Sequence, residues 1–423
     1  MTEHAIVEGP APGDTAPRGK HPPVWLFAIL QIPYGVGGVF SSTIIGRILN
    51  TNQVDHNKSD WAVTASLLIA GFQFLLAPTV DLKLRRRSWY LLMSTVAACL
   101  IMAAMLTPMP QHVDRFIFFA LTGQVAIGFL SACLGGLMVS TIPNELRGRA
   151  SGFSNFGNVG VAAIAGGVFL QLLETRTLPL VGMVVAAAVI LPALVVLTIE
   201  ESPPELKSAR ELFGRMFGDI WTLLKRREGW TGLLLCMSPV GTAALLQLFS
   251  SYASLYHASD RTVTWVNGYI GGFLTGAACL LGGWICDRMN RRWAYIGAGA
   301  LTAICGGVMA FAPITPQTYA IGALTYLFIT GFCYAAFTAF ELEVIGTQSA
   351  TAGTQYSLYT SAGNFAIFYV LRLDSMGREW YEHRHGEALA PRGLLGTDAI
   401  VNVVGIVLFL ALITLLKPKR KLA

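Results

Sequence analysis

Long apolar runs separated by short polar stretches make up most of the chain. Each run has about 20 residues, the length a helix needs to cross a hydrocarbon core about 30 Å thick. The runs do not alternate in polarity as barrel strands would, and a helix satisfies its own backbone in lipid. The pattern predicts an all-α integral membrane protein with twelve transmembrane helices, near residues 24–45, 61–80, 89–107, 116–142, 152–173, 179–199, 230–256, 263–285, 293–313, 319–345, 354–375 and 398–416.

Composition agrees with this prediction. Of 423 residues, 54% are hydrophobic and 13% are charged, whereas soluble domains are roughly 25% charged. The seven cysteines all fall in predicted helices or at their ends, and no pair has CxxC spacing, so we expect apolar packing residues and no metal site. No Ser/His/Asp, HExxH or paired-carboxylate arrangement lies at a common depth. We therefore predict neither an enzyme nor a cofactor.

The basic residues divide unequally between the two sides of the predicted membrane. Twelve spans put both termini on one side, and that side holds 21 of the 30 Lys and Arg residues, the other side 7, and two lie in helix ends. Basic residues favour the cytoplasmic side. The sequence thus predicts a multi-pass inner-membrane protein with both termini in the cytoplasm. The net charge of +6 is a topology signal, so it requires no nucleic-acid partner.

An internal repeat relates the two halves of the chain. Asp81 and the Arg85-Arg86 pair match Asp287 and Arg291-Arg292 at an offset of 206 residues. The same offset aligns "RASGFSNFGN" at 149–158 with "QYSLYTSAGN" at 355–364. Two separate matches at one offset indicate a duplicated six-helix unit.

The repeat divides the chain into two bundles with polar connections. We predict a disordered cytoplasmic tail at 1–22 in place of a signal peptide, bundles at 23–199 and 230–416, a cytoplasmic linker with an amphipathic surface helix at 200–229, and a basic tail at 417–423.

This organisation resembles the major facilitator superfamily, whose six-helix halves bind substrate midway between them. An Asp followed by a basic cluster after the second and eighth helices is similar to the loop motif of that superfamily, and "IPNELRGRASG" at 142–152 is similar to its junction between helices four and five. The resemblance implies that Asp81 faces the helix start near Thr354-Gln355 and Asp287 the start near Ser151-Gly152, each holding the cytoplasmic side shut. It implies a gating role for Asp81, Arg85, Arg86, Arg147, Asp287, Arg291 and Arg292.

A narrower resemblance points to a subfamily. "APTVDLKLRRRSW" at 77–89 and "SATAGTQYSLYTSAGN" at 349–364 are similar to the AmpG-type permeases and the related peptide–acetyl-coenzyme A transporters. Gly353 replaces the usual Ala of that pattern. The resemblance implies import of a muropeptide or a related metabolite.

Polar stripes within the helices are candidates for the substrate cavity, because polar groups are costly against lipid. In the superfamily that the chain resembles, helices 1, 4, 7 and 10 line the cavity. The alternative for single Ser and Thr residues is hydrogen bonding between helices. The candidate substrate-binding residues are Gln31, Tyr34, Gln124, Ser131, Thr242, Gln247, Tyr334, Thr338, Asn364 and Arg372, the last as a partner for an anionic group.

Two acids lie in the predicted tenth helix. Glu341 continues the stripe of Tyr334 and Thr338, whereas Glu343 lies about 200° away on an apolar face. We expect Glu341 to couple transport to protons, with a solvated position at the membrane boundary as the alternative. A metal site at Glu382, His383 and His385 in the predicted outer loop 376–397 is disfavoured, because no second His follows at i+4.

Together these features predict a monomeric secondary transporter that moves a small organic solute by alternating access, with proton symport favoured. A proton-antiport efflux system for drugs or metabolites is the alternative. A non-transporting membrane sensor is disfavoured, because the loops hold no signalling domain. The expected partners are a small-molecule substrate and membrane lipid.

The charge asymmetry makes a testable prediction about topology. Alkaline phosphatase fused after Gly386 should be active, because that residue is predicted to face the periplasm, and a fusion after Lys225 should be inactive. Activities measured in whole cells, normalised to fusion abundance, check both assignments. The reverse pattern of activity would overturn the orientation.

Overall fold

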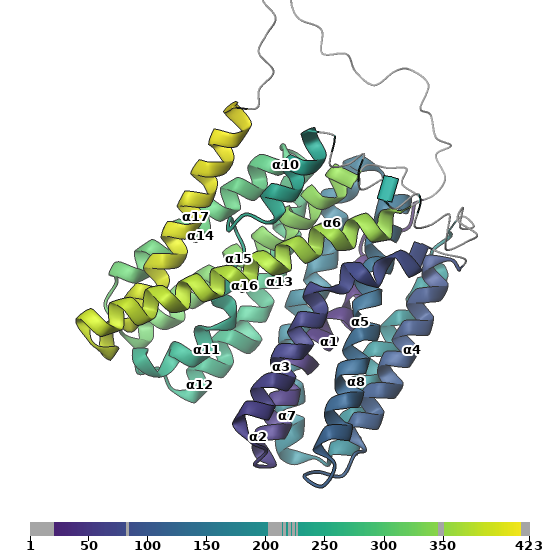
Figure 1. The fold of residues 1–423 in the computed structure, drawn as a ribbon, viewed down its shortest axis with the longest axis horizontal. Coiled ribbons are helices and arrows are strands. Elements are labelled where there is room, and N and C mark those ends of the chain that lie inside the picture. Colours follow the sequence, from purple (N-terminus) through teal and green to yellow (C-terminus); the bar gives the residue numbers. More distant parts are fainter. Residues whose placement is uncertain are drawn as a thin grey trace, which may run out of the picture.

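Nearly every residue that the structure describes is helical. The computed structural model describes residues 21–81, 84–201, 214, 217–218, 221, 225, 227–345 and 351–415, and these contain no strand. Figure 1 shows the helices before residue 200, in purple and blue, beside those after residue 227, in teal to yellow; we call these groups the first and second halves. Residues 1–20 of the predicted N-terminal tail, the predicted C-terminal tail and most of the 200–229 linker lie outside the described residues.

The first half contains six spanning segments, several of them composed of more than one helix type. They are α1 (Leu26–Val39) with η1 (Phe40–Ile44) and α2 (Ile45–Thr51); α3 (His56–Gly71) with η2 (Gln73–Leu75) and η3 (Ala77–Asp81); α4 (Arg86–Met105); α5 (Val113–Thr141); η4 (Asn144–Leu146) with α6 (Arg147–Asn155), η5 (Phe156–Val161) and α7 (Ala162–Thr175); and α8 (Leu178–Ala193) with η6 (Leu194–Thr198).

The second half follows the same order. Its elements are α10 (Arg227–Cys236) with η7 (Ala244–Gln247), α11 (Phe249–Tyr252) and η8 (Ala253–Tyr256); α12 (Asp260–Val263) with η9 (Thr264–Ile270) and α13 (Gly271–Cys286); α14 (Arg291–Phe311); α15 (Pro316–Ile345); α16 (Ala352–His385); and η10 (Glu387–Leu389) with α17 (Ala390–Leu415).

Each of the twelve predicted runs corresponds to helical structure in the described chain. Among the described residues, nine helices are long and apolar enough to cross a membrane, and there are ten if the bent pair Trp61–Gly71 and Gln73–Asp81 is one span. The other two runs correspond to the interrupted segment from α10 to η8 and to α16. Large apolar side chains such as Phe273, Ile321 and Phe311 are exposed around the outside, as a lipid-facing surface requires.

The predicted seventh helix at 230–256 is interrupted, which corrects the sequence prediction of a continuous span. Helix α10 stops at Cys236, and Gly241 and Ala243 adopt positive φ of 63° and 53°. The irregular backbone is satisfied by other helices: Tyr295 Oη donates to Val240 O at 2.6 Å, and Gly241 N donates to Asn402 Oδ1 at 2.8 Å. Such a break is tolerated at membrane depth because it is buried in protein.

The prediction that residues 376–397 form a loop is also wrong. Helix α16 continues to His385, and Gly386, with φ of 88°, turns the chain into η10 and α17. This extension of α16 is polar, and an ion pair one turn apart stabilises it: Arg378 lies 3.9 Å from Glu382. His383 and His385 contact carbonyl oxygens of their own helix.

Glycines bring the two halves into direct backbone contact where α6 and η5 cross α13. A Cβ on Gly160 would lie 2.7 Å from Gly276 Cα, and one on Gly283 would lie 2.8 Å from Gly152 Cα. The sequence ladder Gly268, Gly272 and Gly276 thus packs through its last two members, whereas a Cβ on Gly268 meets nothing within 4 Å. Small residues allow this close approach of helices.

A matched pair of substitutions tests the crossing. Gly160→Ala should destabilise the protein by about 1–3 kcal/mol, because its methyl group must displace backbone of the other half. Gly268→Ala should be neutral or stabilising by up to about 1 kcal/mol, because the position is open and Ala favours helix. Thermal unfolding of both variants in detergent measures the difference. Equal melting temperatures would show that the contact contributes nothing.

Candidate functional site

Asp81, at the end of η3 in the first half, lies at the N-terminus of α16 in the second. Its Oδ2 accepts hydrogen bonds from Thr354 N at 3.0 Å and Thr354 Oγ1 at 2.9 Å, and its Oδ1 is 3.4 Å from Gly353 N. Arg86 Nε donates to the same Oδ1 at 3.0 Å. A carboxylate at the positive end of a helix is stabilised by the helix dipole and by the free N–H groups there. This contact, the first latch, is the one that the sequence predicts for Asp81.

Asp287, at the end of α13, makes the corresponding contact in the opposite direction. Its Oδ1 accepts from Gly148 N at 2.7 Å, and its Oδ2 accepts from Arg149 N at 3.2 Å and Arg149 Nε at 2.8 Å. These residues form the first turn of α6, so the predicted partner Ser151-Gly152 is wrong by about one turn. We call this contact the second latch.

Both latches lie at one end of the molecule, which we call the basic-loop end. Arg86 reaches the carbonyl oxygen of Gly136, and Arg147 reaches that of Val139, one turn further along α5. Arg147 is buried and also donates to Leu342 O in the second half. Arg291 donates to Asn144 Oδ1 at 2.9 Å. Contacts between the halves therefore close this end.

Two predicted gating residues take no part in the bridging contacts that the structure describes. Arg85 is the residue before α4, where its carbonyl oxygen accepts the Ser88 N–H at 2.9 Å. The guanidinium of Arg292 lies 5.9 Å from the ring centre of Phe340, within its own half. Their positions fit charges at a membrane surface better than a latch.

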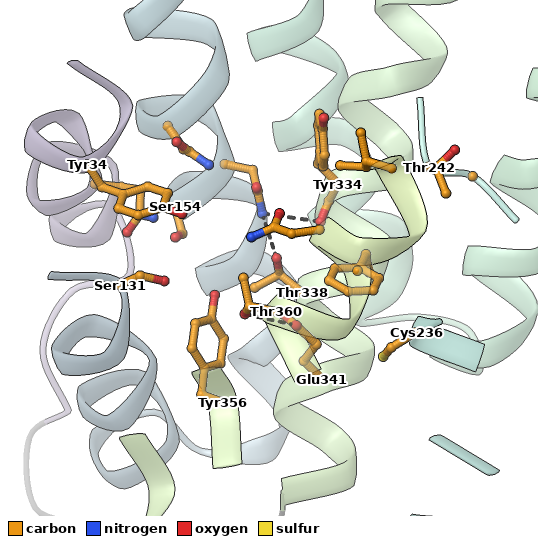
Figure 2. A pocket seen from close by; sticks show the side chains of 18 of the residues that line it. Tyr34, Ser131, Ser154, Cys236, Thr242, Tyr334, Thr338, Glu341, Tyr356 and Thr360 are labelled. Atoms are coloured by element: carbon orange, nitrogen blue, oxygen red, sulfur yellow. Dashed lines mark hydrogen bonds between the residues drawn. The ribbon is translucent and has the colours of Figure 1, made fainter. Parts of the chain in front are cut away.

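A cavity of about 100 Å³ lies between the halves. One water needs roughly 10–15 Å³ of such space, so the cavity has room for several water molecules or part of a small solute. Figure 2 shows Tyr34, Ser131 and Ser154 of the first half facing Tyr334, Thr338 and Glu341 of the second. The lining comprises Gln31, Tyr34, Ser131, Ser154, Asn155, Asn158, Cys236, Gly241, Thr242, Tyr295, Tyr334, Phe337, Thr338, Glu341, Tyr356, Thr360, Gly363, Asn364 and Ile367.

The lining is polar but has few charges. Among the described residues it contains one carboxyl group and no Lys or Arg. Asn155 Nδ2 donates to Thr338 Oγ1 at 3.1 Å across the two halves. Three buried lining atoms, Gln31 Oε1, Thr242 Oγ1 and Glu341 Oε2, have no hydrogen-bond partner in the described protein. Buried polar atoms are rarely left unpaired, so these atoms are available to a solute or to water.

Most of the predicted substrate-binding residues meet in this cavity, together with the predicted coupling residue Glu341: Gln31, Tyr34, Ser131, Thr242, Tyr334, Thr338 and Asn364. Gln124 does not, because its Oε1 accepts from Ser41 Oγ at 2.6 Å and joins α5 to η1. Arg372 is 68% exposed and lies 3.8 Å from Glu379 on the outside of α16, which contradicts a role in the cavity. The side chain of Gln247 is outside the described residues.

Several cavity residues of α6, η5 and α16 are not among the residues predicted from the sequence. They include Ser154 and Asn158 in the first half and Thr360 in the second. The repeat offset of 206 residues aligns Ser154 with Thr360 and Asn158 with Asn364. The repeated segments thus mark the cavity wall as well as the duplication.

The burial of Glu341 contradicts a solvated position at the membrane boundary. Its side chain is 1% exposed, and Oε1 accepts a hydrogen bond from Thr360 Oγ1 at 3.0 Å. Glu343, predicted on an apolar face, instead pairs with Arg291 at 3.2 Å. The two acids of α15 therefore lie in different places, one in the cavity and one in the closed basic-loop end.

The family model described as Major Facilitator Superfamily matches residues 27–370. The chain belongs to this superfamily. A comparison with curated protein sequences gives no match, so the AmpG-type assignment stays a prediction. The superfamily assignment agrees with the two six-helix halves, the latches and the central cavity.

Solved structures share the fold at low sequence identity. The proton:xylose symporter XylE, bound to 6-bromo-6-deoxy-D-glucose, is similar with a TM-score of 0.70 and 12% identity over 92% of this chain and 95% of its own. The E. coli fucose:proton symporter FucP has a TM-score of 0.65 and 13% identity over 92% and 98%. The human organic anion transporter MFSD10 has a TM-score of 0.69 and 13% identity over 92% and 100%.

If the first latch holds the basic-loop end closed, a buried cysteine near it should become more reactive when the latch is removed. Ser357 lies one turn inside α16 and is fully buried. With Cys99 replaced by Ser to remove the exposed thiol, Ser357→Cys should react slowly with a maleimide. Adding Asp81→Asn should raise the rate about tenfold or more, since hydrogen bonds to a charged group contribute roughly 1.5–3 kcal/mol.

Asp55→Asn is the matched control for this measurement. Asp55 also accepts a helix N-terminal hydrogen bond, from Lys58 N, but it belongs to the exposed start of α3 and touches no residue of the second half in the described chain. It should leave the labelling rate unchanged. Equal rates in the Asp81 and Asp55 variants would leave Asp81 without a gating role.

Proposed function

We propose that this protein is a proton-coupled importer that moves a small organic solute across a bacterial inner membrane by alternating access. The observation that carries the proposal is a polar cavity midway between two halves that carries one buried carboxyl group. The two latches support alternating access, because both are carboxylate–helix contacts between the halves at the same end and could break together. With the topology predicted above, this end is cytoplasmic.

The cavity chemistry favours a solute rich in hydroxyl or amide groups. Its amide and hydroxyl side chains offer donors and acceptors, and Tyr34, Tyr334 and Tyr356 offer ring faces and edges. The absence of Lys and Arg from the described lining argues against a strongly anionic solute such as a coenzyme A ester. The sugar hydroxyls and peptide amides of a muropeptide, or the hydroxyls of a simple sugar, would find partners in this cavity. The AmpG-like sequence motifs favour the muropeptide.

Glu341 is our candidate for the proton-coupling group. It lies on α15 in the second half, and its partner Thr360 lies on α16. An unpaired charge in a buried site is costly, so a carboxyl there should take up a proton when the cavity closes and lose it when water or solute rearranges. Its free Oε2 is the atom at which that proton or a solute donor would sit.

Identifying the solute requires a direct binding measurement. Purified protein should be screened by thermal shift against muropeptides, simple sugars, siderophores, coenzyme A esters and cationic drugs. We expect muropeptides or sugars to raise the melting temperature and coenzyme A esters not to. Gln31→Leu removes an unpaired cavity acceptor and should weaken the binding of the solute about tenfold, or roughly 1.4 kcal/mol. Stabilisation by coenzyme A esters alone would contradict the proposed solute class.

Glu341→Gln tests the coupling. Glutamine imitates the protonated carboxyl permanently, so the variant should lose uphill uptake driven by an imposed proton gradient and keep downhill counterflow. Both are measured in proteoliposomes with the compound that the screen identifies. Glu379→Gln, an acid exposed on the outside of α16, is the control and should retain both activities. Accumulation by Glu341→Gln against a gradient would exclude Glu341 as the coupling group, and gradient-driven efflux by the wild type would favour the antiport alternative.

A further inference from the structure

Two carboxyl groups lie buried between α16 and α17, outside the cavity. Asp374 and Asp398 are both 0% exposed. The helices approach closely here, since a Cβ on Gly377 would lie 1.8 Å from Thr397 Oγ1. Asp374 is 22 residues beyond Ala352, about 30 Å along α16 at 1.5 Å per residue. The pair therefore lies far from the basic-loop end, near the opposite side of the membrane.

Asp374 has no hydrogen-bond partner for either oxygen among the described residues. Both Oδ1 and Oδ2 are buried and make no hydrogen bond in the described protein. Asp398 is better supported: Tyr326 Oη donates to its Oδ2 at 3.3 Å, and Asn402 Nδ2 lies 3.4 Å from its Oδ1. Asp374 lies about one turn before Gly377 and Asp398 directly follows Thr397, so the close contact of Gly377 with Thr397 brings the two carboxyl groups to the same level of the helix pair.

The surrounding elements supply no balancing charge among the described residues. Around the pair, α14 approaches Asp398 at Gly306, where a Cβ would lie 3.4 Å from Oδ2, and α15 contributes the Tyr326 hydroxyl. The other titratable groups of the surrounding helices are the thiols of Cys305 and Cys333 and the phenol of Tyr252. Arg372 pairs with Glu379, and Arg378 pairs with Glu382 and lies over the Tyr252 ring. Arg392 on α17 makes no ion pair with either aspartate in the described chain. Neither aspartate has an ion-pair partner in the described part of the chain.

Two ionised carboxylates cannot stay side by side in such a place. An isolated buried charge costs several kcal/mol even after relaxation, and a second like charge adds repulsion. A metal cation such as Na⁺ would relieve the charge but needs more oxygen ligands. The described surroundings offer the carboxyls and the Tyr326 hydroxyl, while Asn402 Oδ1 is occupied by Gly241 N. A proton shared by the two carboxyl groups needs only one oxygen to carry it and one oxygen to accept its hydrogen bond.

We propose that Asp374 and Asp398 form a second proton-binding site, separate from the cavity, in which the pair holds at least one proton between α16 and α17. Asn402 connects the site to the interrupted seventh segment, because its amide group contacts Asp398 and accepts from Gly241, which lines the cavity. The inference concerns proton occupancy alone and does not depend on the transported solute or on Glu341.

Infrared spectroscopy of the purified wild-type protein at neutral pH tests the proposal. A protonated carboxyl absorbs separately from an ionised one through its C=O stretch. Asp374→Asn and Asp398→Asn should each remove or shift one component of this absorption. Glu341→Gln should leave that component intact, which separates this site from the proposed coupling group. Identical spectra for the wild type and both asparagine variants would show that the pair is ionised and would overturn the proposal.

Two further measurements exclude the rival occupants. Because asparagine imitates a protonated aspartate in shape and charge, both variants should melt at or above the wild-type temperature at neutral pH. Strong destabilisation of both would instead indicate an ionised pair held by a partner. Replacing choline chloride by NaCl at constant pH should leave the wild-type melting temperature unchanged. A sodium-dependent increase that both variants lose would identify a sodium site and contradict the proton assignment.

Discussion

A carboxylate placed at the N-terminus of a helix in the opposite half is the contact on which the arrangement of the two halves depends. It occurs twice: Asp81 caps α16 and Asp287 caps α6. The repeat offset of 206 residues relates Asp81 to Asp287 and also Gly148 to Thr354, so donor and acceptor positions are both duplicated. Each contact replaces water at free helix N–H groups, and each is short-range and charged. A modest separation of the halves therefore breaks both without disturbing either bundle.

The latches and the cavity share the same helices. The segment from α6 to η5 begins at the second latch and continues to Ser154, Asn155 and Asn158 in the cavity wall, while α16 begins at the first latch and continues to Thr360 and Asn364. Movement at the basic-loop end must therefore move polar groups that line the cavity. Thr360 of α16 also donates a hydrogen bond to Glu341. A movement of α16 would therefore change the surroundings of this carboxyl group.

Sequence patterns predicted the features that depend on short motifs and lipid contact. Twelve apolar runs, the duplication and the Asp81 contact follow from hydropathy and the offset. The partner of Asp287 was placed one turn too far, although the offset applied to Thr354 points to Gly148. The interruption after Cys236 depends on Tyr295 and Asn402, which satisfy its backbone from distant helices. The burial of Asp374 was missed because α16 extends to His385, which moves this residue away from the helix end where a charged side chain would reach water.

In this description of the molecule, the two latches together hold the basic-loop end closed. Leu84 in the first half and Met289 in the second are exposed positions at this end, suitable for spin labels. Pulsed electron–electron double resonance on the labelled protein should give one short distance in the wild type. With Asp81→Asn and Asp287→Asn combined, a longer distance should become the main population. An unchanged distance distribution in the double variant would contradict the claim.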